Sequence, residues 1–75
     1  MRMMEKKPFY FGELLKELRI EKNFSQTRLA EFLHVSQDTV SLWERNKSLP
    51  DFLMIVKLSE IFEISADILL GIKDY

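Results

Sequence analysis

Apolar side chains recur along this chain at the spacing of α-helix faces, and no stretch of useful length alternates as a half-buried strand would. The first helix ends at Asn23, and its apolar face at i, i+3, i+4 and i+7 consists of Phe11, Leu14, Leu15 and Leu18. A second helix, which Ser25 caps, carries the apolar residues Leu29, Ala30, Phe32 and Leu33. A third follows Ser36 and has as its apolar positions Val40 and Trp43. The pattern therefore predicts an all-α protein.

Two more helices are expected in the C-terminal part. Asp51 is placed to cap a fourth helix over about residues 52–62, whose core stripe would be Phe52, Ile55, Leu58 and Phe62. A short fifth helix begins after Ser65 and stops before Gly71, which suits a left-handed C-terminal position. We therefore expect a compact five-helix domain over residues 9–72, between a flexible N-terminal tail at 1–8 and a C-terminal tail at 73–75.

The chain must reverse sharply after each of the first three helices, yet no glycine stands at those points. Such stops often need a positive φ, for which glycine is the usual residue. Here the residues are Asn23, His34 and Asn46, and asparagine and histidine are enriched several-fold in that conformation among non-glycine residues. We therefore expect a left-handed backbone at all three.

The composition argues against several classes of function. The 75-residue chain has no cysteine and one histidine, so we expect no disulfide, no metal site and no cofactor. Neither a Gly-rich phosphate loop nor a Ser-His-Asp spacing is present, which argues against an enzyme. The longest apolar run, Phe52 to Val56, is far shorter than the roughly 20 residues of a membrane helix, and no signal-peptide pattern is seen. We expect a cytoplasmic protein with no membrane contact and no small-molecule effector.

The charge is weakly asymmetric along the chain. Residues 1–47 carry nine Lys/Arg and seven Asp/Glu, a net charge of +2, whereas residues 48–75 carry two Lys and five Asp/Glu, a net charge of −3. Their sum is the overall charge of −1, which by itself does not favour a nucleic-acid partner. Because the distribution matters more than the total, the basic half remains compatible with one.

The most informative stretch is QTRLAEFLHVSQDTVSLWER, residues 26–45. Two helices joined by a short connection can cross steeply when a small side chain lies at the crossing, and Ala30 supplies one. Side chains that would face inward and fix the angle are Leu29, Leu33, Val35, Val40 and Trp43. The remaining face of the third helix would stand exposed, in a position to enter a DNA major groove.

Residues 26–45, together with LLKELRIEKNFS before them and EISADILLG near the end of the chain, resemble the XRE-type helix-turn-helix family. This family includes the lambda-repressor-like and Cro proteins. The resemblance implies a five-helix lambda-repressor-like domain with the helix-turn-helix at helices 2 and 3. It also implies a prokaryotic or phage-type regulator that binds double-stranded DNA sequence-specifically, as a repressor on a palindromic operator. Family members usually have glycine at positions 23, 34, 46 and 63, so the fourth helix is expected to end differently at Glu63.

The resemblance also assigns roles in DNA binding. Phosphate contacts are expected from Gln26, Thr27, Arg28, Thr39, Arg45, Lys47 and Ser48. Base edges would be read by Gln37, Asp38, Ser41 and Leu42. Gln37 could pair with adenine, Asp38 could accept from cytosine N4, and Leu42 could pack on a thymine methyl group. Asp38 has a second interpretation, because an acidic residue in a first turn also favours the helix dipole.

Arg19 and Glu44 are expected to be structural. The family pattern pairs an arginine late in helix 1 with the glutamate of W-E-R, and a forked ion pair would lock helix 1 to the recognition helix. Trp43 is expected in the core.

Helices 4 and 5 carry more apolar residues than one core face needs. The surplus residues predict a homodimer interface made of Leu53, Met54, Ile61, Ile68, Ile72 and Tyr75. A two-fold dimer would place two recognition helices one DNA turn apart. The same residues could instead wrap into the chain's own core. An alternative function is a protein-interaction module, of antitoxin or adaptor type, whose DNA face has been lost; Asp38 and the acidic pI of about 5.8 are consistent with it.

Overall fold

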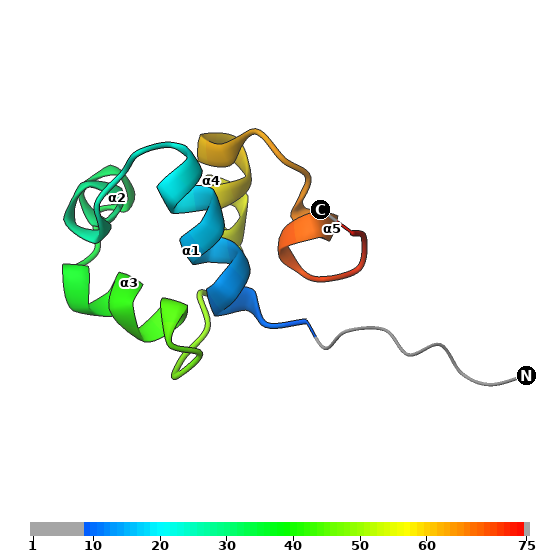
Figure 1. Ribbon diagram of the computed structural model, residues 1–75, viewed down its shortest axis with the longest axis horizontal. Helices are drawn as coiled ribbons and strands as arrows, with labels where there is room; N and C mark the ends of the chain where they lie inside the picture. Colours follow the sequence, from blue (N-terminus) through cyan, green and yellow to red (C-terminus); the bar gives the residue numbers. More distant parts are fainter. Residues whose placement is uncertain (1–8, 75) are drawn as a thin grey trace, which may run out of the picture.

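The computed structural model describes residues 9–74, which form five helices and no strand (Figure 1). The helices are α1 (Phe11–Glu21), α2 (Gln26–Leu33), α3 (Gln37–Glu44), α4 (Phe52–Phe62) and α5 (Ala66–Leu69). The predicted all-α class and the order of elements are confirmed. The expected tail at 1–8 and Tyr75 lie outside the described residues.

Four of the helices begin at a polar side chain that caps them. Ser25, Ser36, Asp51 and Ser65 each have extended backbone angles, and each side chain accepts a hydrogen bond from the backbone N–H three residues later. Such a bond satisfies one of the N–H groups that a helix start leaves without a partner. The capping residues were therefore predictable from local sequence.

The predicted helix ends at Asn23, His34 and Asn46 are confirmed, with φ angles of 61°, 59° and 59°. The expectation at Glu63 is wrong, because this residue takes the same conformation, with φ 57°. The backbone N–H of Ile64 donates to the carbonyl of Ser59, so α4 closes as a glycine-ended helix would. The turn into α5 thus overrides the preference of the glutamate for negative φ.

Exchanging Glu63 for glycine should raise the free energy of unfolding by about 0.5–1 kcal/mol. Left-handed geometry costs a residue with a Cβ roughly 1–2 kcal/mol, and glycine avoids that cost. Glycine's greater freedom in the unfolded chain offsets part of the resulting stabilisation. Asn46→Gly is the matched control with the same φ and should destabilise, because Asn46 Oδ1 accepts the Gly12 N–H at 2.9 Å. Urea unfolding of both variants tests this prediction. It would be contradicted if both substitutions changed the free energy of unfolding in the same direction.

Thirteen buried apolar residues from all five helices form one core, including the four predicted on α1. The expected α4 stripe needs one correction, because the Phe52 side chain is 82% exposed. Phe52 is the first residue of α4 and directly follows the exposed N-cap residue Asp51, so the buried stripe begins one turn later, at Ile55.

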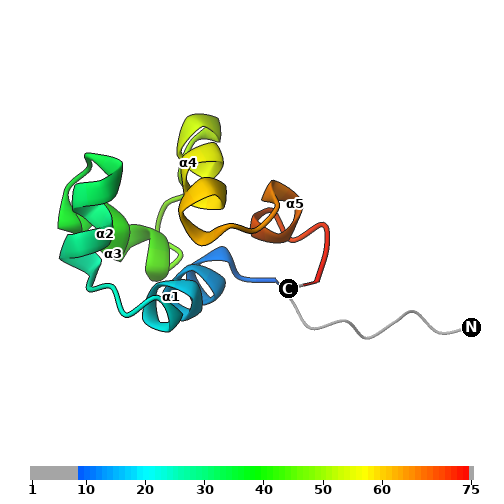
Figure 2. The same cartoon turned by 90° about the horizontal axis from the view of Figure 1, so that it is seen from above.

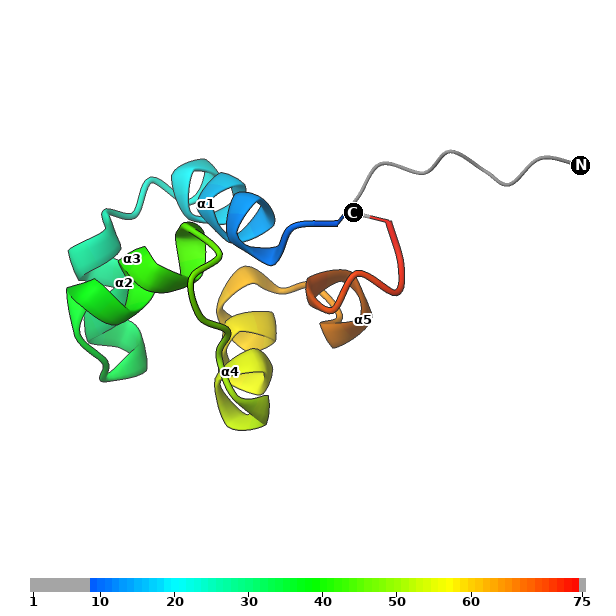
Figure 3. The same ribbon diagram turned by 90° about the horizontal axis from the view of Figure 1, so that it is seen from below.

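Helices α2 and α3 lie on one side of α1 and α4, and α5 lies on the other (Figure 1). The three ribbon views agree that α2 and α3 lie together at one end of the molecule and α5 at the other (Figures 1, 2 and 3). Helix α3 packs against both α2 and α1, and α5 packs against α4. The recognition-helix candidate is therefore held from behind by two helices while its outer side faces away from the core.

Gly12, in the first turn of α1, allows α1 to approach the end of α3 closely. A Cβ at this buried position would lie 2.4 Å from the Glu44 carbonyl oxygen and 2.5 Å from that of Trp43. In addition, the Gly12 N–H donates to the Asn46 side chain. Glycine is otherwise a poor helix residue, which is the one sequence signal that could have indicated this crossing.

Candidate nucleic-acid interface

The outer face of α3 brings the predicted base-reading residues together. Gln37, Asp38 and Leu42 are exposed and Ser41 is half-buried, whereas Val40 and Trp43 on the opposite face are buried. The residues 37, 38, 41 and 42 share one side because a helix repeats about every 3.6 residues. The arrangement provides a mixed polar and apolar strip with its backing fixed in the core.

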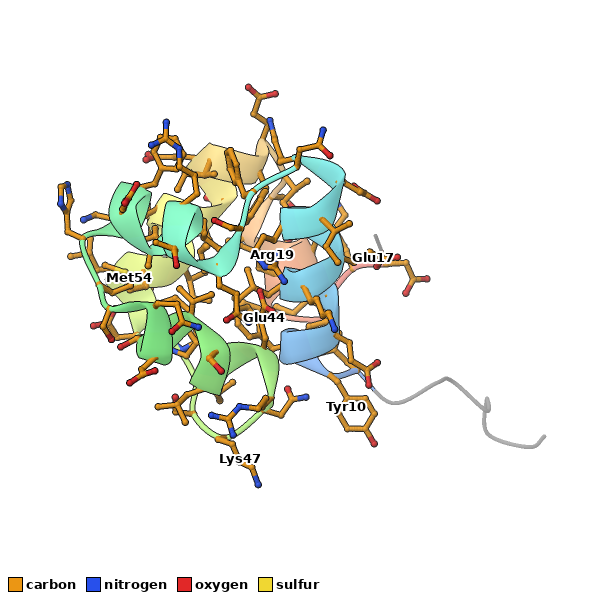
Figure 4. All side chains as sticks on the ribbon, turned by 60° about the vertical axis from the view of Figure 1, so that its left-hand side comes forward. Tyr10, Glu17, Arg19, Glu44, Lys47 and Met54 are labelled. Atoms are coloured by element: carbon orange, nitrogen blue, oxygen red, sulfur yellow. The ribbon has the colours of Figure 1, made fainter. Side chains whose placement is uncertain are left out.

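The exposed strip continues beyond the end of α3. Arg45 is the C-cap residue, and its Nε donates to the Ser41 hydroxyl at 3.2 Å, which holds the guanidinium along the outer face. Lys47 and Ser48 follow in an exposed loop, and Figure 4 shows the Lys47 side chain extending outward from it. Two cationic side chains therefore flank one end of the strip.

At the start of α3, Asp38 and Thr39 occupy different environments. Asp38 is an exposed acidic residue in the first turn, a position compatible with both of its interpretations. Thr39 is half-buried, and its hydroxyl lies 2.9 Å from that of Ser36, so it takes part in the capping turn. Its predicted phosphate contact would have to share that hydroxyl.

Gln26 connects the two helices of the motif. Its Nε2 donates to Glu44 Oε1 at 2.9 Å, and its Oε1 accepts from Gln37 Nε2 at 2.6 Å. The side chain thus links the start of α2 with both ends of α3. The sequence offered no signal for this bridge, since the three residues are brought together only by the steep crossing of α2 and α3.

Arg19 and Glu44 form a forked ion pair between α1 and α3. Arg19 Nε donates to Glu44 Oε2 at 2.6 Å and Arg19 Nη2 to Oε1 at 3.1 Å, and Figure 4 shows the two side chains facing each other. Arg19 Nη1 also donates to the carbonyl of Phe24 at 2.8 Å. The side chains are only 12% and 4% exposed, so the pair is structural rather than a surface contact.

The other two predicted phosphate contacts on α2 differ from each other. Thr27 is exposed at the start of the helix. Arg28 is also exposed, but its guanidinium lies 3.3 Å from Glu31 and 5.0 Å from the ring centre of Phe32. That ring in turn packs against Phe24, with centroids 5.1 Å apart. Arg28 is therefore engaged on its own helix, away from the strip on α3.

The predicted dimer residues separate into two groups. Leu53 and Ile72 are exposed, at 57% and 70%, whereas three others are half-buried and pack against the core, namely Met54, Ile61 and Ile68. Tyr75 lies outside the described residues. Three further exposed apolar side chains from this part of the chain, Leu49, Phe52 and Leu70, were not among the predicted dimer residues. We use the name α4–α5 apolar surface for Leu49, Phe52, Leu53, Leu70 and Ile72.

Leu49 and Leu70 belong to one hollow on this surface. Its other lining residues are Phe9, Phe11, Pro50, Ile55 and Leu69.

Over residues 9–74, no group of three or more His, Cys, Asp or Glu side chains could hold a metal ion. Within the same range, no helix has both the length and the apolar content needed to cross a membrane.

Known proteins resemble this chain both in sequence and in fold. The profile of the Helix-turn-helix family matches residues 15–69. The chain is 42% identical over 60 residues to an HTH-type transcriptional regulator of the Bacillus subtilis SPbeta prophage, YonR, and 40% identical over 61 residues to the transcriptional activator BcrR of Enterococcus faecalis. The matches cover 80% and 81% of this chain but 56% and 30% of those relatives, so the chain spans about half of their length or less.

Two solved structures match nearly over their whole length. The P22 c2 repressor in complex with a synthetic operator has a TM-score of 0.78 and 27% identity, and the match covers 83% of this chain and 94% of the repressor chain. SinR in complex with DNA has a TM-score of 0.72 and 33% identity, with 80% and 97% covered. This chain therefore belongs to the XRE-type helix-turn-helix family, and its five helices have the lambda-repressor-like fold.

Proposed function

We propose that this chain is the DNA-binding part of a transcriptional regulator that reads double-stranded DNA with α3 in the major groove. The observation that carries the proposal is the outer strip of α3, where Gln37, Asp38, Ser41 and Leu42 stand clear of the core while Val40 and Trp43 anchor the helix. The P22 c2 repressor and SinR, whose folds match, are each described in complex with DNA. Such a regulator acts by binding rather than catalysis, in the cytoplasm of a prokaryotic cell.

Affinity would come chiefly from phosphates on both sides of the groove. On one side, Gln26 and Thr27 lie at the N-terminus of α2, where backbone N–H groups and the helix dipole favour an anion. Gln26 gives one amide hydrogen to Glu44, so the second remains to meet a phosphate. On the other side we propose Arg45, Lys47 and Ser48. Thr39 and Arg28 are secondary contacts, since both side chains already have partners.

Base preference would come from the side chains nearest the groove floor. Gln37 offers an amide to adenine, and Leu42 offers an apolar contact to a thymine methyl group. Ser41 shares its hydroxyl with Arg45 and so ties a base-reading position to a phosphate-binding one. Occupation of an operator would repress transcription by occlusion. The relative BcrR, however, is named an activator. A reporter gene placed behind the selected site distinguishes repression from activation.

The test is selection of bound duplexes from random DNA, followed by titration at two salt concentrations. A dimer that neutralises about 6–10 phosphates should lose roughly 10³–10⁵ in affinity between 50 and 200 mM salt. Little binding even at low salt would contradict DNA recognition and favour a protein-interaction module with the same fold.

Gln37→Ala and Lys47→Ala should weaken binding in different ways. Loss of the Gln37 amide should cost about 1–3 kcal/mol at one base pair and relax the preference there. Loss of the Lys47 charge should weaken binding to all sequences alike and lower the salt slope by about 1 per copy. Competition assays on the selected site and on random DNA measure both effects. Equal losses on the two DNAs for Gln37→Ala would refute its role as a base reader.

We also propose a homodimer through the α4–α5 apolar surface. Large exposed apolar side chains in this number are typical of an interface, and two of them, Leu49 and Leu70, line the same hollow. A two-fold axis there would pair two α3 helices for a palindromic site. In sedimentation velocity, Phe52→Asp should shift the chain from dimer to monomer, while Ile20→Asp, at an exposed apolar residue of α1, should not. A wild-type chain that stays monomeric without DNA would contradict a free dimer.

A further inference from the structure

The residues that lead into α1 direct three aromatic side chains to different sides of the molecule. Phe9 lies against the end of α5, since a Cβ on Gly71 would come within 2.6 Å of the Phe9 ring. Phe11 is buried in the core. Tyr10, between them, has extended backbone angles, with φ −123° and ψ 113°, and an extended backbone turns successive side chains to opposite sides. Tyr10 therefore faces away from α5 and is 49% exposed.

A hydrogen bond holds this segment beside the loop that follows α3. The Gly12 N–H donates to Asn46 Oδ1 at 2.9 Å, and a Cβ on Gly12 would lie 2.4 Å from the Glu44 carbonyl oxygen. Tyr10 stands two residues before Gly12, and Lys47 directly follows Asn46, so both exposed side chains come from adjoining stretches of backbone. Figure 4 shows the Tyr10 ring and the Lys47 side chain extending from the same side of the molecule.

The side chain of Tyr10 combines a rigid ring with one hydrogen-bond donor. A phenolic hydroxyl can donate to a phosphate oxygen, and tyrosine is one of the uncharged residues that proteins use for this contact. The ring turns about only two side-chain angles, so little conformational freedom is lost when the hydroxyl meets an acceptor. The adjoining cationic side chain of Lys47 attracts the phosphates of a DNA strand toward the same side.

An exposed aromatic ring can also mark a contact between protein chains, but the position of Tyr10 argues against one. The hollow of the α4–α5 apolar surface includes Phe9, Leu49 and Leu70 among its lining residues, and Tyr10 is not one of them. The extended backbone that sends Phe9 to that hollow turns Tyr10 away from it. Tyr10 therefore belongs with the cationic loop after α3 rather than with the apolar surface.

We propose that the hydroxyl of Tyr10 binds a backbone phosphate beside the one held by Lys47, so that the DNA-binding surface extends from α2 and α3 to the segment before α1. The inference rests on the proposed function, since it requires α3 in the major groove. Asn46 is the positioning residue, because its side chain holds this segment against the loop. The contact adds affinity without adding a charge, and only charged contacts release the counterions that make DNA binding salt-dependent.

Tyr10→Phe removes the hydroxyl and keeps the ring. In titrations of the selected duplex and of random DNA, this variant should bind both about three- to tenfold more weakly for each bound copy, as expected for one hydrogen bond. The slope of log K against log salt should stay at the wild-type value, whereas Lys47→Ala lowers it by about 1 per copy. Tyr10→Lys places a cation at the same point and should raise that slope by about 1 per copy.

The phosphate itself is located with duplexes in which one phosphate at a time is replaced by a neutral methylphosphonate. At the phosphate bound by Tyr10, this replacement should weaken the wild-type chain and weaken Tyr10→Phe clearly less, because the contact is already lost. The same comparison with Lys47→Ala locates the phosphate bound by Lys47. The two phosphates should be neighbours on one strand.

Ile20→Ala, at an exposed residue near the other end of α1, is the matched control and should leave affinity and salt slope unchanged. Wild-type affinity in Tyr10→Phe, or a loss that couples to no phosphate near that of Lys47, overturns the inference while DNA recognition stands. A Tyr10→Phe chain that also loses dimer in sedimentation velocity overturns it too, since the ring then serves a contact between copies. A wild-type chain that binds no duplex even at low salt refutes the proposed function itself.

Discussion

Gly12→Ala should destabilise the domain by about 3 kcal/mol, although alanine is the better helix former by about 1 kcal/mol. The new methyl group would lie within 2.5 Å of two backbone carbonyl oxygens at the end of α3, and backbone cannot move aside as a flexible side chain can. The steric effect should therefore exceed the gain in helix propensity. In a domain of this size, where a single core supplies only about 3–5 kcal/mol, such a loss leaves much of the protein unfolded.

Urea unfolding followed by the fluorescence of Trp43, the single tryptophan, measures this loss. Lys16→Ala, at an exposed position on the same helix, is the matched control and should stay within about 0.5 kcal/mol of the wild type. If Gly12→Ala were as stable as that control, α1 and α3 could not cross as closely as described. Any folded fraction should bind DNA more weakly, because α1 sets the position of α3.

Glu44→Ala should cost about 3–5 kcal/mol, the range for a buried ion pair that loses one partner. The substitution leaves the charged Arg19 side chain, which is only 12% exposed, without its carboxylate partner. It also removes the oxygen that accepts a hydrogen bond from Gln26. Arg19→Ala should have a similar effect, because the Glu44 carboxylate is then stranded and the Phe24 carbonyl loses its donor.

The double variant Arg19→Ala/Glu44→Ala tests whether the two side chains stabilise the fold as an interacting pair or contribute separately to the free energy of unfolding. Each single change already abolishes the shared interaction, so the double loss should be clearly smaller than the sum of the two single losses. Urea unfolding of the four proteins completes the cycle. Additive losses would mean that the two side chains stabilise the fold independently, in conflict with the forked geometry.

Local features of the chain were predictable because each depends on contacts within about one helical turn. Ser25, Ser36, Asp51 and Ser65 cap helices through bonds to residues three positions later, and the apolar face of α1 follows directly from helical periodicity. The left-handed Glu63 was missed for the opposite reason. Its own preference pointed elsewhere, and the turn that seats α5 determined its conformation.

The exposed strip on α3 was equally visible in the sequence, since residues at spacings of three and four share a helix side. The bonds made by its members were not. For Gln26 only a phosphate contact was expected. In the structure its amide oxygen accepts a hydrogen bond from Gln37, and its amide nitrogen donates one to Glu44. Likewise, Phe52 fits the α4 core stripe by periodicity but lies beyond the end of the core.

The sequence alone therefore determined where the helices begin, most of the residues on their apolar faces, and the family to which the chain belongs, because these properties are encoded by neighbours a few residues apart. The tertiary structure decided which groups meet across helices: Gly12 with Asn46, and Gln26 with Gln37 and Glu44. Such contacts depend on the angle and closeness at which distant helices cross. That geometry emerges only when the whole core packs at once.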